Sequence, residues 1–280
     1  LGAIETPIVL TNTLSVGAAW DALCGYMLES VPEIGSTTGT VNPVVAECND
    51  GYLNDIRGRH VKREHVIEAL RGAKAGSVQE GAVGAGTGMS CLGFKGGIGT
   101  ASRILNGSIS DRHLGGLVLA NFGGARDLLI GGAPVGARLE EKRKDPPAPP
   151  GSIVIVVATD APLSDRQLSR VAKRTQGGLA RVGSTFSNGS GDFAIAFSTK
   201  NRIPHSVERP FDEMEEPFVR DDSEEMASLF RASVEATEEA VLNAVFRATT
   251  VAGRSGNEKR ALPLDEVAEV LREYRVLRQE

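Results

Sequence analysis

The sequence has 280 residues, of which 41% are hydrophobic and 24% charged, which is ordinary for one large or two modest globular domains able to bury a core. The formal net charge of -5 and the aromatic content of 5% argue against a nucleic-acid partner, because they offer neither a basic footprint nor many stacking platforms. No apolar run approaches the roughly 20 residues of a membrane span, and the opening LGAIETPIVL lacks the features of a signal peptide. We therefore expect a cytoplasmic chain with no membrane partner.

Cysteines and histidines show no pattern typical of a metal centre. Cys24, Cys48 and Cys91 are far apart and odd in number, which favours scattered reduced thiols over a disulfide framework. His60 and His65 are five residues apart, whereas a helical zinc motif needs a spacing of four. We expect no metal and no organic cofactor.

The first part of the chain alternates between strand and helix patterns. A β-prone run at 7–12 precedes a helix over 16–29, for which Ser15 is the expected N-cap. A second strand over 43–47 precedes an amphipathic helix over 61–73.

Glycines crowd the segment 81–99, which predicts a loop or a surface of close backbone approach. A phosphate-binding loop is a poor interpretation, because Lys95 is followed by Gly96 and Gly97 and not by the serine or threonine that opens a helix in that motif.

Two strands joined by a tight turn are expected over 115–122 and 126–138, followed by a charged, proline-rich connector over 139–150. The β-branched run 153–158 then predicts a strand buried on both faces.

Beyond this strand, Ser164 and Gln167 form a capping-box pattern that predicts a helix ending near Gly183. A polar loop over 184–192 and a buried strand over 193–198 should follow. The remaining segments are an irregular excursion at 200–222 and helices over 223–251 and 263–276.

The Gly151–Ser152 bond carries the most specific chemistry. If it is cut, Ser152 becomes a terminus that holds a hydroxyl and an α-amine on one residue, and an α-amine pKa of about 7.7–8 suits a general base better than a lysine at about 10.4. Ser152 Oγ could make the cut by attacking the Gly151 carbonyl, since glycine leaves room for the strained conformation. On the dipeptide alone, a plain loop-to-strand junction is the better interpretation.

The surrounding motifs change that balance. The segments are VNPVVAEC, DGYLNDI, GAGTGMSCLGFKGGIGTASR, LVLANFGG, APVG, GSIVIVVATDAPL and GSTFSNGSGDFAIAFST. Together they resemble the DmpA-type family, the L-aminopeptidase/D-Ala-esterase/amidases and β-aminopeptidases. The matching segments run from about residue 7 to residue 200, and the C-terminal 80 residues match loosely.

The resemblance implies a four-layer α/β/β/α sandwich of the DmpA and ornithine acetyltransferase type. It implies that residues 1–280 form a single catalytic domain, cleaved at Gly151–Ser152 into an α chain, 1–151, and a β chain, 152–280. Relatives are typically tetramers of such αβ units. The implied substrate is a small peptide or an amino-acid amide, hydrolysed through an acyl-enzyme.

The resemblance also assigns residues to the site. Ser152 matches the nucleophile, and Asn121 matches the asparagine whose amide can donate to the oxyanion. Ser190 and Asp192 match a serine and a carboxylate that orient the nucleophile or hold an ammonium, although several relatives have glutamate in place of Asp192. Without the resemblance, a strand end, a turn serine and a loop cap would be the better explanations of Asn121, Ser190 and Asp192.

Substrate preference is less well specified. Relatives carry an aromatic residue of the substrate pocket where this sequence has Asn49, and Tyr52 is the nearest phenol. We expect these two residues, with Gly96 and Gly97, to contribute to substrate binding. Relatives also have about a hundred residues before the point where this chain starts, so either an upstream portion is missing or the fold is trimmed.

Three other functions stay open at the level of sequence. An acyltransferase of the ornithine acetyltransferase type shares the implied fold but uses threonine as its nucleophile. A pyruvoyl decarboxylase also arises by cleavage before a serine, but its new terminus loses the amine. A binding protein could keep the fold and never be cut.

Overall fold

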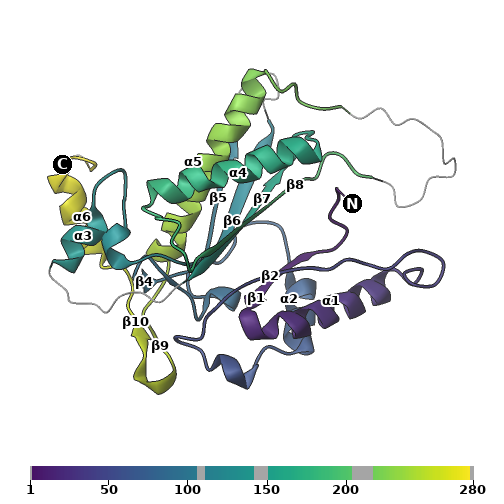
Figure 1. Ribbon diagram of the computed structural model, residues 1–280, viewed down its shortest axis with the longest axis horizontal. Helices are drawn as coiled ribbons and strands as arrows, with labels where there is room; N and C mark the ends of the chain where they lie inside the picture. Colours follow the sequence, from purple (N-terminus) through teal and green to yellow (C-terminus); the bar gives the residue numbers. More distant parts are fainter. Residues whose placement is uncertain (1, 106–110, 142–150, 204–216, 278–280) are drawn as a thin grey trace.

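A computed structural model of the protein describes residues 2–105, 111–141, 151–203 and 217–277. Its centre is a four-stranded sheet in the order β5-β6-β7-β8 (Figure 1). The strands are β5 (Gly97–Ile104), β6 (His113–Asn121), β7 (Ser152–Thr159) and β8 (Gly191–Ser198). β6 runs antiparallel to β5 and β7, whereas β7 and β8 are parallel. The β-branched run of β7 therefore lies between two hydrogen-bonded neighbours, as its composition predicts.

Two long helices cover one face of this sheet: α4 (Asp165–Arg181) and α5 (Glu224–Phe246). The capping box predicted at the start of α4 is present, since Ser164 Oγ accepts from the Gln167 amide and Gln167 Oε1 accepts from the Ser164 amide. Alternate β7 residues, Ile153 and Ile155 among them, are buried in the core beneath the helices.

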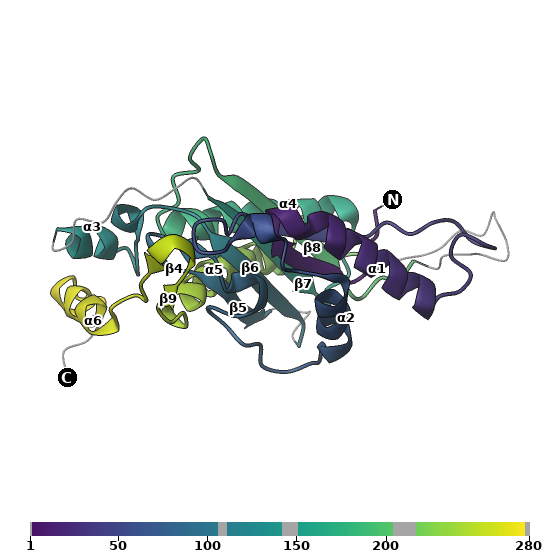
Figure 2. The ribbon, with the colours of Figure 1, turned by 90° about the horizontal axis from the view of Figure 1, so that it is seen from below.

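A second, smaller sheet packs on the opposite face. It consists of the parallel strands β1 (Ile8–Asn12) and β2 (Val44–Cys48), and β2 contacts β6 and β7. The helices α1 (Val16–Ser30) and α2 (Arg63–Gly72) lie against the outer side of this pair (Figures 1 and 2). The order of layers is helices, sheet, sheet, helices, which confirms the predicted α/β/β/α arrangement.

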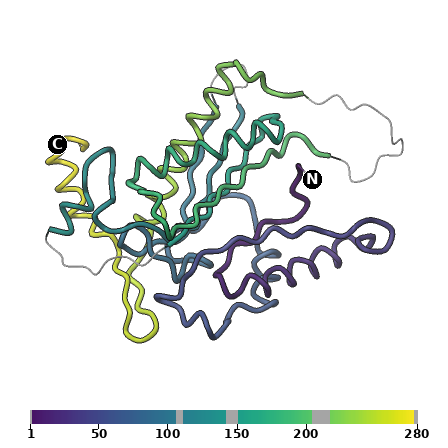
Figure 3. The backbone as a smooth tube through the Cα atoms, viewed as in Figure 1, coloured from purple at the N-terminus to yellow at the C-terminus, as the bar shows by residue number. Residues whose placement is uncertain are grey.

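Shorter elements close one end of the molecule. They are β3 (Ser90–Cys91), β4 (Phe94–Lys95), α3 (Val135–Glu140), β9 (Val251–Ala252), β10 (Glu258–Lys259) and α6 (Leu264–Glu273). Figure 3 shows the C-terminal hairpin of β9 and β10 returning to the N-terminal third of the chain, where the Arg254 amide donates to the Leu53 carbonyl. Within the described residues, no helix is long and apolar enough to span a membrane.

Several predicted elements differ in the structure. The prediction of a strand over 126–138 is wrong. The chain turns back at Gly131 and Gly132, whose φ angles are 58° and 81°, and then enters α3. The glycine-rich segment is more ordered than expected, since it contains β3, β4 and the start of β5.

The predicted strand at 193–198 exists as β8, but it is not buried. β8 is the edge strand of the sheet, and Phe193 on it is 61% exposed. Ser15 precedes α1 without capping it, because its side chain makes no cap hydrogen bond and its buried Oγ has no partner among the described residues. Most of the predicted connector, 142–150, and residues 204–216 of the predicted excursion lie outside the described residues.

Candidate active site

Three strand ends meet around the predicted nucleophile. Ser152 is the first residue of β7, and it stands opposite Asn121, the last residue of β6, and opposite Gly191, the first residue of β8. Side chains directly opposite each other on antiparallel strands share one face, with their Cβ atoms about 4.5–5.5 Å apart. The sheet therefore brings Ser152 and Asn121 together, with Ser190 and Asp192 on either side of Gly191.

Gly151 occupies a place where no side chain fits. A Cβ atom built on it would lie 2.0 Å from the Asn121 carbonyl oxygen and 2.9 Å from the Phe122 Cα. Real Cβ atoms essentially never approach backbone so closely, so the chain can enter β7 along this path only with glycine at 151. Glycine here thus has a packing reason as well as the chemical one inferred from the sequence.

Asn121 is only 6% exposed, and its carboxamide is held at both ends. Its Oδ1 accepts from the Ser90 amide at 2.9 Å, and its Nδ2 donates to the Asn49 carbonyl at 2.9 Å. Turning the amide over would set its NH2 against an N–H and its oxygen against a carbonyl oxygen, so these two contacts fix its orientation. One Nδ2 proton is used in this way, and the amide carries a second.

Ser190 and Asp192 form a pair beside the nucleophile. Ser190 Oγ donates to Asp192 Oδ1 at 2.6 Å, the short distance expected when a hydroxyl donates to a carboxylate. The residue between them, Gly191, lies against Ser152, because a Cβ at Gly191 would be 3.7 Å from the Ser152 Cβ. The predicted serine and carboxylate therefore flank the β8 residue that pairs with Ser152.

Cys48, which the sequence treats as a scattered thiol, lies directly against the nucleophile. It ends β2, and its Sγ is 3.4 Å from the Ser152 carbonyl oxygen and 3.5 Å from the Leu119 carbonyl oxygen. Burial raises the pKa of the Cys48 thiol to about 12, so it stays protonated and able to donate at neutral pH. Its position next to Asn49 in the ECND motif is the signal that could have drawn attention to it.

The four predicted substrate-binding residues fall into two pairs. The Asn49 side chain is exposed and accepts from the Gly51 amide, and the Tyr52 ring lies under Lys259, whose Nζ is 5.3 Å from the ring centroid. Gly96 and Gly97 are buried, and a Cβ would lie 2.7 Å from the Ala120 carbonyl oxygen at Gly96 and 1.9 Å from the Gly81 carbonyl oxygen at Gly97. Close packing accounts for both glycines, and a part in substrate binding stays a prediction for all four residues.

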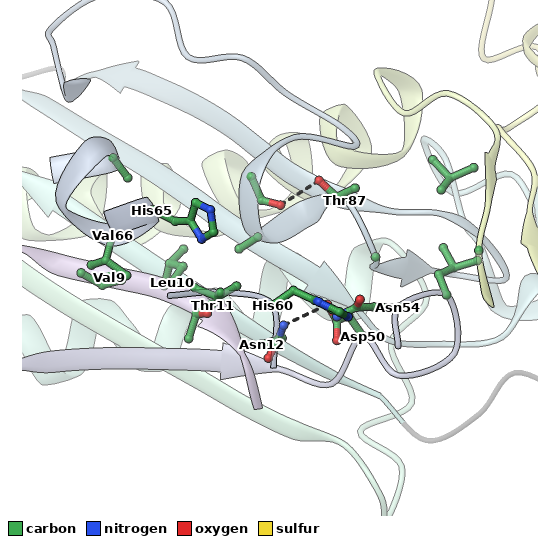
Figure 4. A pocket seen from close by; sticks show the side chains of 18 of the residues that line it. Val9, Leu10, Thr11, Asn12, Asp50, Asn54, His60, His65, Val66 and Thr87 are labelled. Carbon is green, nitrogen blue, oxygen red and sulfur yellow. Dashed lines mark hydrogen bonds between the residues drawn. The ribbon is translucent and has the colours of Figure 1, made fainter. Parts of the chain in front are cut away.

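A cavity of about 510 Å³ lies along β1, beside the site (Figure 4). At its polar end, Asn12 Nδ2 and Asn54 Nδ2 both donate to Asp50 Oδ2, and burial raises the pKa of the Asp50 carboxyl. Asp50 follows Asn49, whose carbonyl holds Asn121, but neither Ser152 nor Asn121 lines the cavity. The cavity is therefore a neighbour of the nucleophile and separate from it. Its histidines, His60 and His65, belong to no metal-binding group among the described residues.

Comparison with known proteins decides the family. The model of peptidase family S58 matches residues 1–259. The chain belongs to peptidase family S58.

Relatives in this family agree along most of the chain. The β-peptidyl aminopeptidase BapA of Sphingosinicella microcystinivorans is 40% identical over 290 residues, which cover 99% of this chain and 71% of that protein. A crystal structure of a Pyrococcus horikoshii OT3 protein matches with a TM-score of 0.89 at 52% identity, covering 97% of this chain and 73% of that one. A third match is the L-aminopeptidase D-Ala-esterase/amidase of Ochrobactrum anthropi, with a TM-score of 0.87 at 37% identity, covering 97% of this chain and 74% of that one. That protein is described as a prototype for the serine aminopeptidases and a variant of the Ntn hydrolase fold.

These relatives confirm the resemblance to the DmpA-type family and the fold that it implies. The S58 chain is a hydrolase of the N-terminal-nucleophile type, and its broad activity is that of an aminopeptidase or amidase. A peptide substrate is consistent with membership of this aminopeptidase family.

Proposed function

We propose that this S58 chain is a self-processing aminopeptidase or amidase in which Ser152 is both the site of the maturing cut and the nucleophile. The observation that supports the proposal is the meeting of three strand ends at Gly151–Ser152: Asn121 pairs with Ser152, and the Ser190–Asp192 pair flanks Gly191, the residue of β8 that pairs with Ser152.

The cut uses only groups of the chain and one water. Ser152 Oγ attacks the Gly151 carbonyl carbon, the peptide nitrogen leaves as the α-amine of Ser152, and an ester joins Gly151 to Ser152 Oγ. Water then hydrolyses the ester, which leaves a carboxylate on Gly151 and a free hydroxyl on Ser152. The products are an α chain, 1–151, and a β chain, 152–280, that remain one catalytic domain.

The mature site then hydrolyses substrates through an acyl-enzyme. The α-amine of Ser152, with a reference pKa of about 7.7–8, takes the proton from Oγ and gives it to the leaving amine. The second Nδ2 proton of Asn121 donates to the oxyanion, a kind of contact that typically contributes about 10²–10³ in kcat. Ser190 and Asp192 orient the hydroxyl and hold an ammonium, either that of Ser152 or that of the substrate.

The proposed substrates are small peptides and amino-acid amides with a free amino terminus. BapA, at 40% identity, is a β-peptidyl aminopeptidase, which supports including β-amino substrates among those tested. Asn49 and Tyr52 remain our candidates for substrate contacts. We further propose a homotetramer of αβ units in the cytoplasm, the latter supported by three cysteines that form no disulfide among the described residues.

Intact mass of the purified protein beside a Ser152→Ala variant tests the proposal. We expect two fragments matching 1–151 and 152–280 from the wild type, with an unmodified serine terminus, and one uncut chain from the variant. The wild type should release amine from a panel of α- and β-aminoacyl amides, and the variant should not. Light scattering would report the oligomeric state.

Other outcomes point elsewhere. A β chain whose terminus has lost its amine would indicate a pyruvoyl enzyme. Acyl transfer without hydrolysis would indicate the acyltransferase. An uncut wild-type chain without activity would contradict self-processing and favour a binding protein.

A further inference from the structure

We propose that Lys95 is a positioning residue for the reaction, holding the Asn121 carboxamide in its donating orientation through the Met89–Ser90 peptide group. The inference rests on the proposed role of Asn121 in the oxyanion site. It adds a residue that acts on Asn121 through the peptide group to which both are hydrogen-bonded.

Lys95, the last residue of β4, is a fully buried charge, with 0% of its side chain exposed. Its Nζ donates to the carbonyls of Gly86, Met89 and Gly96 at 2.8, 2.8 and 2.7 Å. Three acceptors match the three protons of an ammonium, and no ion pair among the described residues involves this lysine. Burying an ammonium without a carboxylate is costly. An apolar side chain would avoid that cost, but it would leave three buried carbonyls without this donor. The reason for the charge must therefore be sought in the carbonyls that it binds.

The reason lies in the second of these three carbonyls. The Met89 carbonyl and the Ser90 amide belong to one peptide group, so a donor at one end of it acts on the other end. The carbonyl accepts from Lys95 Nζ and from the Gly96 amide, at 3.1 Å, while the Ser90 N–H donates to Asn121 Oδ1 at 2.9 Å. Two donors hold the peptide plane in place, and a cation on the oxygen polarises the group and strengthens its N–H as a donor.

The consequence falls on the proton that Asn121 offers to substrate. With Ser90 bound to Oδ1, the NH2 group faces the other way, where one proton meets the Asn49 carbonyl and the second is left for the oxyanion. If the Met89–Ser90 peptide is free to rotate, Asn121 loses one of the two contacts that distinguish its oxygen from its nitrogen. A reversed amide would set an oxygen toward the developing negative charge and oppose the reaction. Loss of Lys95 should therefore lower kcat more than it changes KM.

A double-mutant cycle on the processed enzyme tests this coupling. Lys95→Met keeps the length of the side chain and removes its donors, and Asn121→Ala removes the amide. We expect Asn121→Ala to lower kcat about 100-fold or more. Lys95→Met should lower kcat about tenfold or more with KM within about twofold of the wild type, and the double variant should be no slower than Asn121→Ala within about twofold. Each kcat is given per two-chain enzyme, counted by intact mass.

A lysine that only supports the fold gives a different result. The fold-losses in kcat from the two single variants would then multiply, so that the kcat of the double variant is lowered by the product of the two single effects. That result, or a Lys95→Met enzyme with wild-type kcat, overturns the proposal. Wild-type kcat in Asn121→Ala would instead overturn the proposed oxyanion role, and activity in Ser152→Ala would overturn the proposed nucleophile.

Ser233→Ala provides a matched control. Ser233 on α5 is fully buried, and its Oγ donates to the carbonyl of Val171 on α4, within the helical layer. Its removal should lower stability and leave kcat unchanged. If Lys95→Met does not fold, the cycle is repeated with Lys95→Gln, which keeps a neutral donor. If neither variant folds, Lys95 is needed for the fold itself and the proposal fails.

Discussion

Gly151 shows how one missing side chain can decide the path of the backbone. The residue passes so close to the Asn121 carbonyl that its Cα hydrogen takes the place where any other residue would carry a Cβ. Cys48 works in the opposite sense, since its buried thiol fills the space behind the Ser152 carbonyl. Together they fix the backbone on both sides of the nucleophile.

Gly151→Ala tests this at the level of one methyl group. We expect the substitution to push the start of β7 away from β6 and to slow conversion to two chains more than tenfold, because the scissile carbonyl moves relative to Ser152 Oγ. Intact mass over time after expression measures the conversion.

Gly115→Ala is the control, because a Cβ at this β6 position meets nothing within 4 Å. It should mature at the wild-type rate. Normal cleavage of Gly151→Ala would show that the close approach to Asn121 does not position the bond.

At the scale of elements, two serines in equivalent positions behave differently. Ser164 caps α4 with a reciprocal bond to Gln167, and α4 covers the central sheet. Ser15 precedes α1, but its Oγ is buried without a partner among the described residues. The Ser164 hydroxyl stabilises its helix through the cap hydrogen bond. The Ser15 hydroxyl loses its hydration on burial and gains no hydrogen bond among the described residues in exchange.

Alanine at these two positions should therefore give different results. Ser164→Ala should lower the free energy of unfolding by about 1 kcal/mol, the usual loss on removing an N-cap. Ser15→Ala should leave it unchanged or raise it slightly. Urea unfolding monitored by circular dichroism measures both, and equal losses at the two sites would contradict the distinction.

At the scale of the whole molecule, the buried charge of Lys95 links stability to pH. Burial lowers the pKa of Lys95 to about 8, from an ordinary value of 10.5. Between these values the unfolded chain keeps the proton that the folded chain has lost. Stability then rises with pH across this window, because the unfolded state binds more protons. Below pH 8 the buried ammonium lowers the free energy of unfolding by its full amount. Above pH 10.5 the contribution of Lys95 to the free energy of unfolding no longer changes with pH.

Comparison with Lys95→Met isolates this effect from other groups that titrate in the same range. From pH 8 to 10, the free energy of unfolding of the wild type should rise relative to that of the variant. Urea titrations at several pH values measure the difference. Parallel pH dependences in the two proteins would show that the folded-state pKa of Lys95 is not lowered.

Local patterns in the sequence were enough to predict the strand of β7, the capping box of α4 and most of the helices. Each depends on residues close together in the chain, such as the β-branched run after Ser152 or the pair Ser164 and Gln167. The resemblance to the DmpA-type family supplied the sandwich and the candidate residues Ser152 and Asn121, because it compares motifs over most of the chain.

Other features depend on segments far apart in the sequence, and they became visible only in the folded chain. The exposure of β8 follows from its place at the sheet edge, and the turn at Gly131 and Gly132 ends what looked like a strand. Motifs along the chain supplied the candidate residues for the chemistry, and local patterns predicted most of the elements that hold them. Packing of distant segments decided that Cys48 lies behind Ser152 and that Lys95 stands behind Asn121, since hydrogen bonds and burial act through space and leave no periodic signal along the chain.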